Sequence, residues 1–298
     1  MALVDIVVVS YNSRETLRDC VAPLAHDPNL QVLIVDNASA DASLETVADL
    51  PVVAIQLPEN DGFAAGCNAG WRAGSAASVL FLNPDAQIVA ASIWHLVEVL
   101  EREPQVGLVA PQILNSDGKL EFSQRRFPRL LSTYAQALFL HRLFPRTGWV
   151  DELVRDPAAY EYSHPVDWVS GACALVRRAL LEQLGGWDER FFLYCEDVDL
   201  CRRIRDAGYE VYYEAAAEAR HLGGASAPRS ALFPILAASR IRYAQKHGGR
   251  TFALLERVGV ALGATTHLVV SQRGLRGRLG HARALGVALS PQRAEHRR

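Results

Sequence analysis

The stretch Val4-Asp5-Ile6-Val7-Val8-Val9, followed by Ser10-Tyr11-Asn12, decides the fold class of this chain. Apolar, mostly β-branched residues fill it almost without interruption, which is typical of a strand buried on both faces in a parallel sheet. The polar residues that follow stand where this strand ends. A chain of 298 residues is long enough to build one large α/β domain, or one domain with an appendage, around such a strand.

The same pattern returns along the first third of the chain. Further strands are expected at residues 32–35, 52–57 and 79–82, and helices at residues 42–50, 64–74 and from Ser13 to about His26. This alternation predicts an α/β fold with a doubly wound, mostly parallel central sheet flanked by helices. In such a sheet, ligands bind beyond the carboxyl ends of the strands. The polar residues at those ends are Tyr11, Asn12, Asp36, Asn37, Asn83 and Asp85.

The middle of the chain continues with less regular elements. We expect a helix and a buried strand between residues 92 and 112, and a hairpin turn at residues 115–118. Further strands are predicted at residues 166–176 and 209–213, and a loop at residues 221–226. The segment 125–146 mixes basic and apolar residues, which fits an interfacial amphipathic helix as well as ordinary core packing.

The run from Gly185 to Arg203 is the most informative for function. It places five acids within twelve residues, among aromatic side chains. From Glu196 onward apolar residues recur at helical spacing, so Glu196 and Asp197 are expected at a junction between a loop and a helix. A carboxylate at such a junction can cap the helix, hold a hydroxyl group or act as a base.

Charge divides the chain into two parts. Residues 1–219 have a balance of −14 and residues 220–298 a balance of +12, although the whole chain has a net charge of −2. A basic C-terminal part favours an anionic partner: membrane lipid, a diphosphate or the acidic front part. Nucleic acid is not supported, because no recognised binding motif accompanies the charge. The apolar run 258–271, with 14 residues, is too short to span a bilayer and predicts a helix lying on an anionic membrane.

Several site classes lack their motifs. The five cysteines are odd in number and form no CxxC pair, and the N-terminus leads directly into a strand. These features predict reduced thiols, a cytoplasmic protein and no zinc site. No GxGxxG follows the first strand and no GxxxxGK[ST] occurs, so dinucleotide and P-loop sites lose their main support.

In the residues at these strand ends and in the run from Gly185, the chain resembles the family-2 glycosyltransferases, inverting enzymes of the GT-A fold. The resemblance extends over residues 4–249. The resemblance is specific because many weak motifs occur in the right order and spacing. They are Ser10-Tyr11-Asn12, Val35-Asp36-Asn37-Ala38-Ser39, Asn60-Asp61-Gly62-Phe63, Asn68, Leu82-Asn83-Pro84-Asp85, Ser170-Gly171-Ala172, the run 185–200 and His221. Within the family the chain is most similar to bacterial rhamnosyltransferases of polysaccharide assembly.

The resemblance implies a GT-A catalytic domain at residues 1–227 and a helical, basic, membrane-associating region at residues 228–298. In the catalytic domain, about 1–112 is implied to bind the nucleotide sugar and about 113–227 the acceptor. Tyr11 is implied to pack on the nucleotide base, Asp36 to hydrogen-bond it, and Asn68 to lie near the ribose or diphosphate. The whole implied donor set is Tyr11, Asn12, Asp36, Asn37, Asn60, Gly62, Phe63, Asn68, Asn83 and Asp85.

The resemblance also implies a cation site and a catalytic base. Asp85 matches the last acid of the family's DxD motif, implied to bind Mg²⁺ or Mn²⁺. His221 matches a histidine that completes the metal or diphosphate site in some members of the family. The motif here reads Asn83-Pro84-Asp85, and an amide ligates a cation more weakly than a carboxylate, so we expect modest affinity or a larger role for His221. Asp197 is the implied base, supported by Glu196. The implied acceptor set is Trp168, Trp187, Asp188, Tyr194 and Glu196.

These roles imply a single displacement that moves L-rhamnose from dTDP-β-L-rhamnose to a lipid-diphosphate-linked or polysaccharide acceptor, with Asp197 as the base. The enzyme is expected at the cytoplasmic face of the inner membrane. Three alternatives remain open on the residues. They are a transferase that uses a UDP-hexose or furanose donor, a non-catalytic nucleotide-sugar-binding protein, and an adaptor whose basic tail binds membrane or protein.

Overall fold

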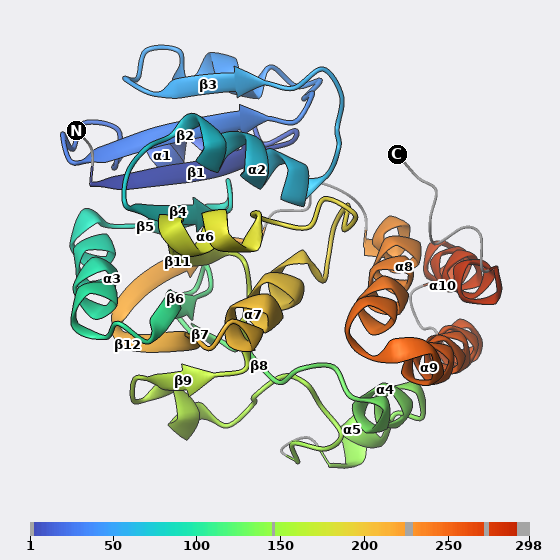
Figure 1. Cartoon of the computed structure of the whole chain (residues 1–298). Coiled ribbons are helices and arrows are strands. Elements are labelled where there is room, and N and C mark those ends of the chain that lie inside the picture. Colours follow the sequence, from blue (N-terminus) through green and yellow to red (C-terminus); the bar gives the residue numbers. More distant parts are fainter. Residues whose placement is uncertain (1–2, 145–146, 224–228, 271–273, 291–298) are drawn as a thin grey trace. The chain divides into compact units, whose positions relative to one another are not determined.

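The computed structural model describes residues 3–144, 147–223, 229–270 and 274–290, and divides the chain into two compact units. Unit 1 comprises Met1–Arg125, Asp156–Arg190 and Asp197–Ser226. Unit 2 comprises Arg126–Arg155, Phe191–Glu196 and Ala227–Arg298. The second unit thus contains the basic C-terminal region and also two segments from the middle of the chain (Figure 1).

Unit 1 is built on a ten-stranded sheet with the order β3-β2-β1-β4-β11-β6-β12-β5, in which β7 pairs with β6 and β9 with β12. Its strands are β1 (Val4–Ser10), β2 (Leu30–Asp36), β3 (Val53–Gln56), β4 (Ser78–Leu82), β5 (Ala86–Ile88), β6 (Val106–Leu114), β7 (Leu120–Glu121), β9 (His164–Val166), β11 (Cys173–Arg177) and β12 (Glu210–His221). Strands β3, β2, β1 and β4 are parallel, whereas β11 enters antiparallel and β6 and β12 are again parallel. The predicted fold class is confirmed, with a mixed second half.

Helices cover both faces of this sheet (Figure 1). They are α1 (Leu17–Val21), α2 (Phe63–Ala73), α3 (Ala90–Arg102), α6 (Arg178–Leu184) and α7 (Glu196–Asp206), with the 3₁₀ turns η1 (Ser43–Val47) and η2 (Pro157–Tyr160). Every residue of β1 is buried, as its sequence predicts. Alternate β1 side chains, such as Ile6, join a core cluster with α1 and α3, while Val7 faces α2.

Two predicted helices are shorter than expected. The helix expected from Ser13 to about His26 is only α1, because the loop before it bonds to the loop after β2 instead of continuing a helix. There the amide of Ser13 donates to Ser43 Oγ, and that of Arg14 to Asp41 Oδ2. The helix expected at residues 42–50 is the 3₁₀ turn η1.

Two strand predictions are corrected as well. Residues 166–176 do not form one strand, because the chain pairs in turn with β12, with the short strand β8 (Gln124–Arg125) and with β4. The middle piece is β10 (Trp168–Val169), which forms a separate two-stranded sheet with β8. Strand β12 continues to His221, the residue predicted to begin a loop, because its last residues pair with both β5 and β6.

Unit 2 is helical in its described residues. Its helices are α4 (Leu130–Ala137), α5 (Leu140–Leu143), α8 (Arg229–His247), α9 (Gly249–Val270) and α10 (Gly274–Leu289). Helices α8, α9 and α10 pack on one another, and α4 packs on α9. A buried ionic cluster holds these segments: the Arg240 guanidinium bonds to Glu152 at 2.7 Å and to Glu256 at 2.9 Å, and Thr133 donates to Glu256.

Helix α9 is longer than the apolar run suggested. The prediction of an element too short to span a bilayer is wrong, because the helix extends over 22 residues from Gly249. Among the described residues it is the one helix that length and composition would allow to cross a membrane. Its apolar window is 22% buried within the protein.

Candidate functional site

The ends of β1 and β2 form a floor of buried polar residues. Asp36 and Asn37 are each 2% exposed and Ser10 is fully buried. Asp36 uses one carboxylate oxygen to accept the amide of Ser39, at 3.2 Å. Among the described residues, Asp36 Oδ1, Asn37 Oδ1 and Ser10 Oγ have no hydrogen-bond partner. Because buried polar atoms are normally paired, three unpaired ones at adjacent strand ends mark a place for a hydrogen-bonding ligand.

The turn before α2 is tied to this floor. The Asn37 side-chain amide donates to the carbonyl of Gly62 at 3.0 Å, and Asn60 Oδ1 accepts the amide of Gly62 at the same distance. Gly62 has a φ of 93°, which only glycine adopts without strain. Phe63 follows and contacts the ring of Trp187 edge-on at 5.8 Å. These hydrogen bonds therefore connect Asn37 to the turn that contains three more predicted donor residues, Asn60, Gly62 and Phe63.

The loop after β1 is exposed. Tyr11 is 39% exposed, which leaves its ring accessible to a ligand. Asn12 has a left-handed backbone, with φ 52°, and its side-chain oxygen accepts the amide of Ala40 at 2.9 Å. Asn12 thus fixes the loop, and Tyr11 offers the accessible ring.

Asn68 lies on α2, and its side chain is fully engaged with protein groups. Its oxygen accepts from Trp71 Nε1 and from the amide of Trp187, at 2.8 and 2.9 Å. Its nitrogen donates to the Trp187 carbonyl and to Glu189. These are all four hydrogen bonds that an amide side chain can make. Asn68 is also 1% exposed, so it joins α2 to the segment around Trp187.

His221 and Asp85 meet, as the sequence predicts for a metal pair. Ala86 in β5 pairs with His221 in β12, which places the preceding Asp85 beside the imidazole. His221 Nε2 lies 3.3 Å from Asp85 Oδ1, and Nδ1 lies 3.4 Å from Glu121 Oε2. Hydrogen bonds to Asp85 and then to Glu121 raise the pKa of His221 to about 10, against the opposing effect of burial. Each ring nitrogen of His221 therefore has a carboxylate oxygen within 3.4 Å.

A divalent cation needs more ligands than Asp85 and His221 alone provide. Among the residues that the structure describes, no three His, Cys, Asp or Glu side chains converge as a ready cation site. A carboxylate and an imidazole suit Mn²⁺ or Mg²⁺ when phosphate oxygens and water complete the shell. The Asp85–His221 pair fits that partial role. Asn83, in the same turn, is half-buried and uses its backbone to bond Ala172 O at 2.9 Å.

Asp197 lies in the first turn of α7. Its carboxylate accepts the amides of Val198 at 2.8 Å and Gly171 at 3.3 Å. Burial raises the pKa of Asp197, against the lowering effects of these amides and of the Arg125 charge. A carboxylate in the first turn of a helix can cap the helix and can also act as a base. The Gly171 amide thus holds Asp197. The carbonyl of the next residue, Ala172, accepts the amide of Asn83 in the turn that carries Asp85.

The predicted acceptor residues differ in setting. Trp168 is 8% exposed and carries the Arg125 guanidinium 5.3 Å above its ring, and the two residues pair across β10 and β8. Trp187 is buried between Phe63 and Phe81. Asp188 forms a two-pronged ion pair with the exposed Arg190.

The loop before Asp197 belongs to unit 2. Tyr194 and Cys195 are consecutive non-glycine residues with left-handed backbones, φ 67° and 65°, a conformation that costs energy for both. Glu196 is 6% exposed and begins α7. Ser239 Oγ, from α8, donates to the carbonyl of Leu193 at 2.8 Å. The chain thus reaches the predicted base through a tight, held turn.

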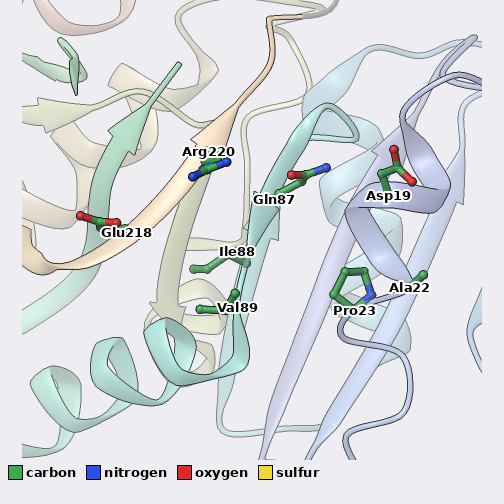
Figure 2. Close-up of a pocket in the computed structure, with 8 residues that line it drawn as sticks. All are labelled: Asp19, Ala22, Pro23, Gln87, Ile88, Val89, Glu218 and Arg220. Carbon is green, nitrogen blue, oxygen red and sulfur yellow. The ribbon is translucent and has the colours of Figure 1, made fainter. Parts of the chain in front are cut away.

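A surface groove of about 570 Å³ lies elsewhere on unit 1 (Figure 2). Figure 2 shows Gln87 and Arg220 on one side, facing Asp19 and Pro23 from α1 and the turn after it. Arg220 immediately precedes His221 in β12, and successive strand residues face opposite sides of a sheet. The groove is therefore on the other side of β12 from the His221–Asp85 pair.

Sequence reasoning missed Glu121 and Arg125. Glu121 lies in β7, the returning strand of the predicted hairpin, opposite Ile113. Counting back from the turn at residues 115–118 would have placed it near the end of β6. Arg125 carries no local signal, because its partner in the strand pair, Trp168, is 43 residues away in sequence.

Comparison with known proteins gives the family of this chain. Residues 5–185 match the family model described as glycosyl transferase family 2. The chain is 33% identical over 263 residues to an N-acetylglucosaminyl-diphospho-decaprenol L-rhamnosyltransferase of Mycobacterium tuberculosis, covering 82% of this chain and 85% of the relative. It is 25% identical over 232 residues to the rhamnosyltransferase WbbL of Escherichia coli K12, covering 74% of this chain and 83% of that protein.

A solved structure shares the fold. The mannosyltransferase PcManGT from Pyrobaculum calidifontis, in complex with GDP-Man and Mn²⁺, superposes with a TM-score of 0.55 at 19% identity. The match covers 97% of this chain and 81% of the mannosyltransferase. The fold is thus GT-A, a mixed and mostly parallel sheet flanked by helices, with further helices at the C-terminal end. On its sheet, its strand-end site and the extent of these matches, the chain is a glycosyltransferase and belongs to glycosyl transferase family 2.

Proposed function

We propose that this glycosyltransferase inverts the anomeric centre of L-rhamnose as it moves the sugar from dTDP-β-L-rhamnose to an acceptor linked to a lipid diphosphate. The relatives named rhamnosyltransferases, one of them acting on a diphospho-decaprenol acceptor by its name, support this choice. In this proposal, residues 1–112 bind the donor, residues 113–227 the acceptor, and residues 228–298 associate with the membrane.

One observation carries the proposal. The segment Gly171–Ala172 bonds to Asp197 through the Gly171 amide and to the Asn83–Asp85 turn through the Ala172 carbonyl. It therefore links a carboxylate with a raised pKa to the turn that carries Asp85, whose carboxylate–imidazole pair with His221 suits a diphosphate and its cation. A base on one side and a leaving-group site on the other are what a single displacement requires.

The reaction follows from these positions. The acceptor hydroxyl oxygen forms a bond to the anomeric carbon while Asp197 takes its proton. The bond from that carbon to the diphosphate oxygen breaks, and the nucleoside diphosphate leaves with the electron pair. Asp85 Oδ1 and His221 Nε2 would hold Mg²⁺ or Mn²⁺, which supplies positive charge to the departing diphosphate. The Mn²⁺ in the structural neighbour supports a cation here.

The donor base is proposed to occupy the floor at the ends of β1 and β2. Asp36 Oδ1 and Asn37 Oδ1 are acceptors without protein partners among the described residues, and a pyrimidine ring offers an N–H donor. Tyr11 packs on the base from its exposed loop. Unlike Asp36, Asn68 has no hydrogen-bonding atom left for the donor, because its amide is already fully bonded. We propose that it positions α2 and Trp187 beneath the donor instead.

The test of the base is Asp197→Asn. General-base help is worth about 10²–10⁴-fold in rate, so we expect kcat to fall by that amount while the donor still binds. The matched control is Asp206→Asn at the other end of α7, where the carboxylate pairs with the half-buried Arg202. A folded Asp197→Asn protein that transfers rhamnose at the wild-type rate would falsify the assignment.

A donor panel tests the sugar. Purified protein with Mn²⁺ and a synthetic lipid-diphosphate sugar should yield product from dTDP-rhamnose in preference to UDP-hexose or furanose donors. Efficient turnover of a UDP-hexose, with none of dTDP-rhamnose, would show that the donor is the alternative one and not dTDP-rhamnose.

Membrane association is proposed for unit 2, on the cytoplasmic face. Its arginines in α9 and α10 include the exposed Arg250, Arg276, Arg278 and Arg283, whereas Glu256, the one acid in those two helices, is buried beside Arg240. Exposed apolar residues accompany them: Leu131, Leu138, Leu143, Phe144, Trp149, Leu236, Leu254, Leu255, Val258, Val269, Val270, Leu275, Leu279 and Leu289. Apolar and basic groups together fit an anionic lipid surface.

A further inference from the structure

The imidazole of His221 has a carboxylate at each of its nitrogens. Asp85 lies 3.3 Å from Nε2, and Glu121 lies 3.4 Å from Nδ1. The side chains of His221 and Asp85 are 19% and 14% exposed, whereas that of Glu121 is 44% exposed. Glu121 has no role in the donor, acceptor or base assignments above.

Sheet register explains how Glu121 comes to this place. Ile113 of β6 pairs with Glu121 of β7 on one side and with Ala219 of β12 on the other. Residues in one row share a face of the sheet, and His221 shares it too, two positions beyond Ala219. Glu121 therefore reaches His221 diagonally across the end of β6. The hairpin at residues 115–118 serves to bring this carboxylate back along the sheet.

We propose that Glu121 is a positioning residue that orients His221 for the cation of the donor diphosphate. The inference rests on the proposed function. A neutral imidazole binds a cation through one nitrogen and carries a proton on the other. Glu121 accepts that proton's hydrogen bond at Nδ1, which fixes the ring and leaves the Nε2 lone pair directed to the side of Asp85. Carboxylates that hold a ligating histidine in this way raise its basicity.

Glu121 is unsuited to be a third ligand of the same cation. The two nitrogens of an imidazole point away from each other, so Asp85 and Glu121 lie at opposite edges of the ring. A cation shared by Asp85 and Nε2 is on the edge that Glu121 does not face. The absence of a three-residue cluster among the described residues agrees with this geometry.

Cation affinity tests the role directly. We would titrate Mn²⁺ into wild-type protein with excess dTDP and follow free Mn²⁺ by electron paramagnetic resonance. Loss of such an outer carboxylate typically weakens metal binding 10–100-fold, so Glu121→Ala should weaken Mn²⁺ by that factor and Glu121→Gln by less. Glu218→Ala is the matched control, because it removes an exposed charge from β12 three residues before His221 and should leave affinity unchanged.

A spectroscopic readout separates positioning from general damage. In long-range ¹H–¹⁵N spectra of the Mg²⁺- and dTDP-bound wild type, His221 should carry its proton on Nδ1. Glu121→Ala should lose this single tautomer while the unfolding midpoint stays near the wild-type value. Mn²⁺ affinity equal to wild type in Glu121→Ala, or an Nε2-protonated His221 in the wild type, would overturn the inference.

The same experiment separates this inference from the proposed function. If the wild type transfers rhamnose with Mn²⁺ but Glu121→Ala binds Mn²⁺ equally well, the positioning role falls and the transferase proposal stands. If the wild type binds no Mn²⁺ in the presence of dTDP, the positioning role falls together with the proposed cation. Weaker Mn²⁺ binding in Glu121→Ala, with rhamnose transfer restored at higher Mn²⁺ concentration, supports both the positioning role and the transferase proposal.

Discussion

Opposing influences act on the pKa of Asp197. Two backbone amides and the charge of Arg125 favour its ionised form, while burial favours the neutral form and prevails. A base at the start of a helix would ordinarily be held ionised to very low pH. The raised pKa means instead that its proton affinity, and so its strength as a base, is greater than that of an exposed aspartate.

The pH dependence of turnover should follow from this balance. A base works when deprotonated, so activity should fall as pH drops through the pKa of Asp197, above its ordinary value of 3.8. Arg125→Gln removes a charge that lowers this pKa, so the acidic limb of the kcat/KM profile should move to higher pH. Arg202→Gln, which pairs with Asp206 on the same helix, should leave the limb in place. A limb unmoved in Arg125→Gln would contradict this account.

Asn68 should matter for stability as well as for activity. Asn68→Ala leaves Trp71 Nε1 and the Trp187 amide without their acceptor, in a buried place. At about 1–3 kcal/mol for each of these two unsatisfied groups, we expect a loss of roughly 2–6 kcal/mol in the free energy of unfolding, measured in urea. The exposed Asn29→Ala should change it by less than about 0.5 kcal/mol. Equal midpoints for the two variants would refute the structural role.

Among the elements, α2 shows how small residues position a site. A Cβ atom at Gly70 would overlap Val7 Cγ1, and one at Gly66 would lie 2.6 Å from Val9 Cγ1. The helix therefore packs directly on β1, and its first turn, with Gly62 and Phe63, reaches the ends of β1 and β2. The small residues of α2 therefore allow tight packing between helix and sheet.

Gly70→Ala tests this packing. Alanine favours a helix over glycine by about 1 kcal/mol, but overpacking against Val7 typically costs about 1–3 kcal/mol, so the variant should be destabilised. Gly286→Ala in α10 is the control, since a Cβ there meets nothing within 4 Å and the helix preference should prevail. Thermal unfolding of both variants gives the comparison. A Gly70→Ala protein as stable as Gly286→Ala would show that the contact relaxes freely.

The sequence predicted elements where local pattern and final environment agree. β1, buried on both faces, and α7, with its apolar spacing from Glu196, were both found. It failed where distant pairing decides: residues 215–217 of β12 are alanines, which prefer helices, yet they lie within a long strand that pairs with β6 and β5. His221 and Glu121 meet only because of that strand. The sequence therefore placed His221 in a loop, and Glu121 was missed.

For the whole molecule, the separation of charge has a measurable consequence. Arg276→Ser with Arg278→Ser removes two exposed charges from α10, each worth about 1 kcal/mol near an anionic surface, so affinity for phosphatidylglycerol vesicles should fall roughly 30-fold. Vesicle sedimentation at low and high salt measures this. Arg102→Ser with Arg202→Ser, a double change in unit 1, should bind as the wild type does. Equal binding of both double variants would argue against unit 2 as the lipid-binding part.

The division into units also determines how the chain tolerates truncation. Unit 2 is assembled from three separate stretches of sequence, so no single cut removes it. A chain ending at residue 226 would keep α4 but lose α9, its packing partner, and would leave the buried Glu152 without Arg240. It would also lose Ser239, which holds Leu193 in the turn leading to Asp197. An attempt to delete the basic tail for solubility would therefore expose an apolar helix and release the turn that precedes Asp197.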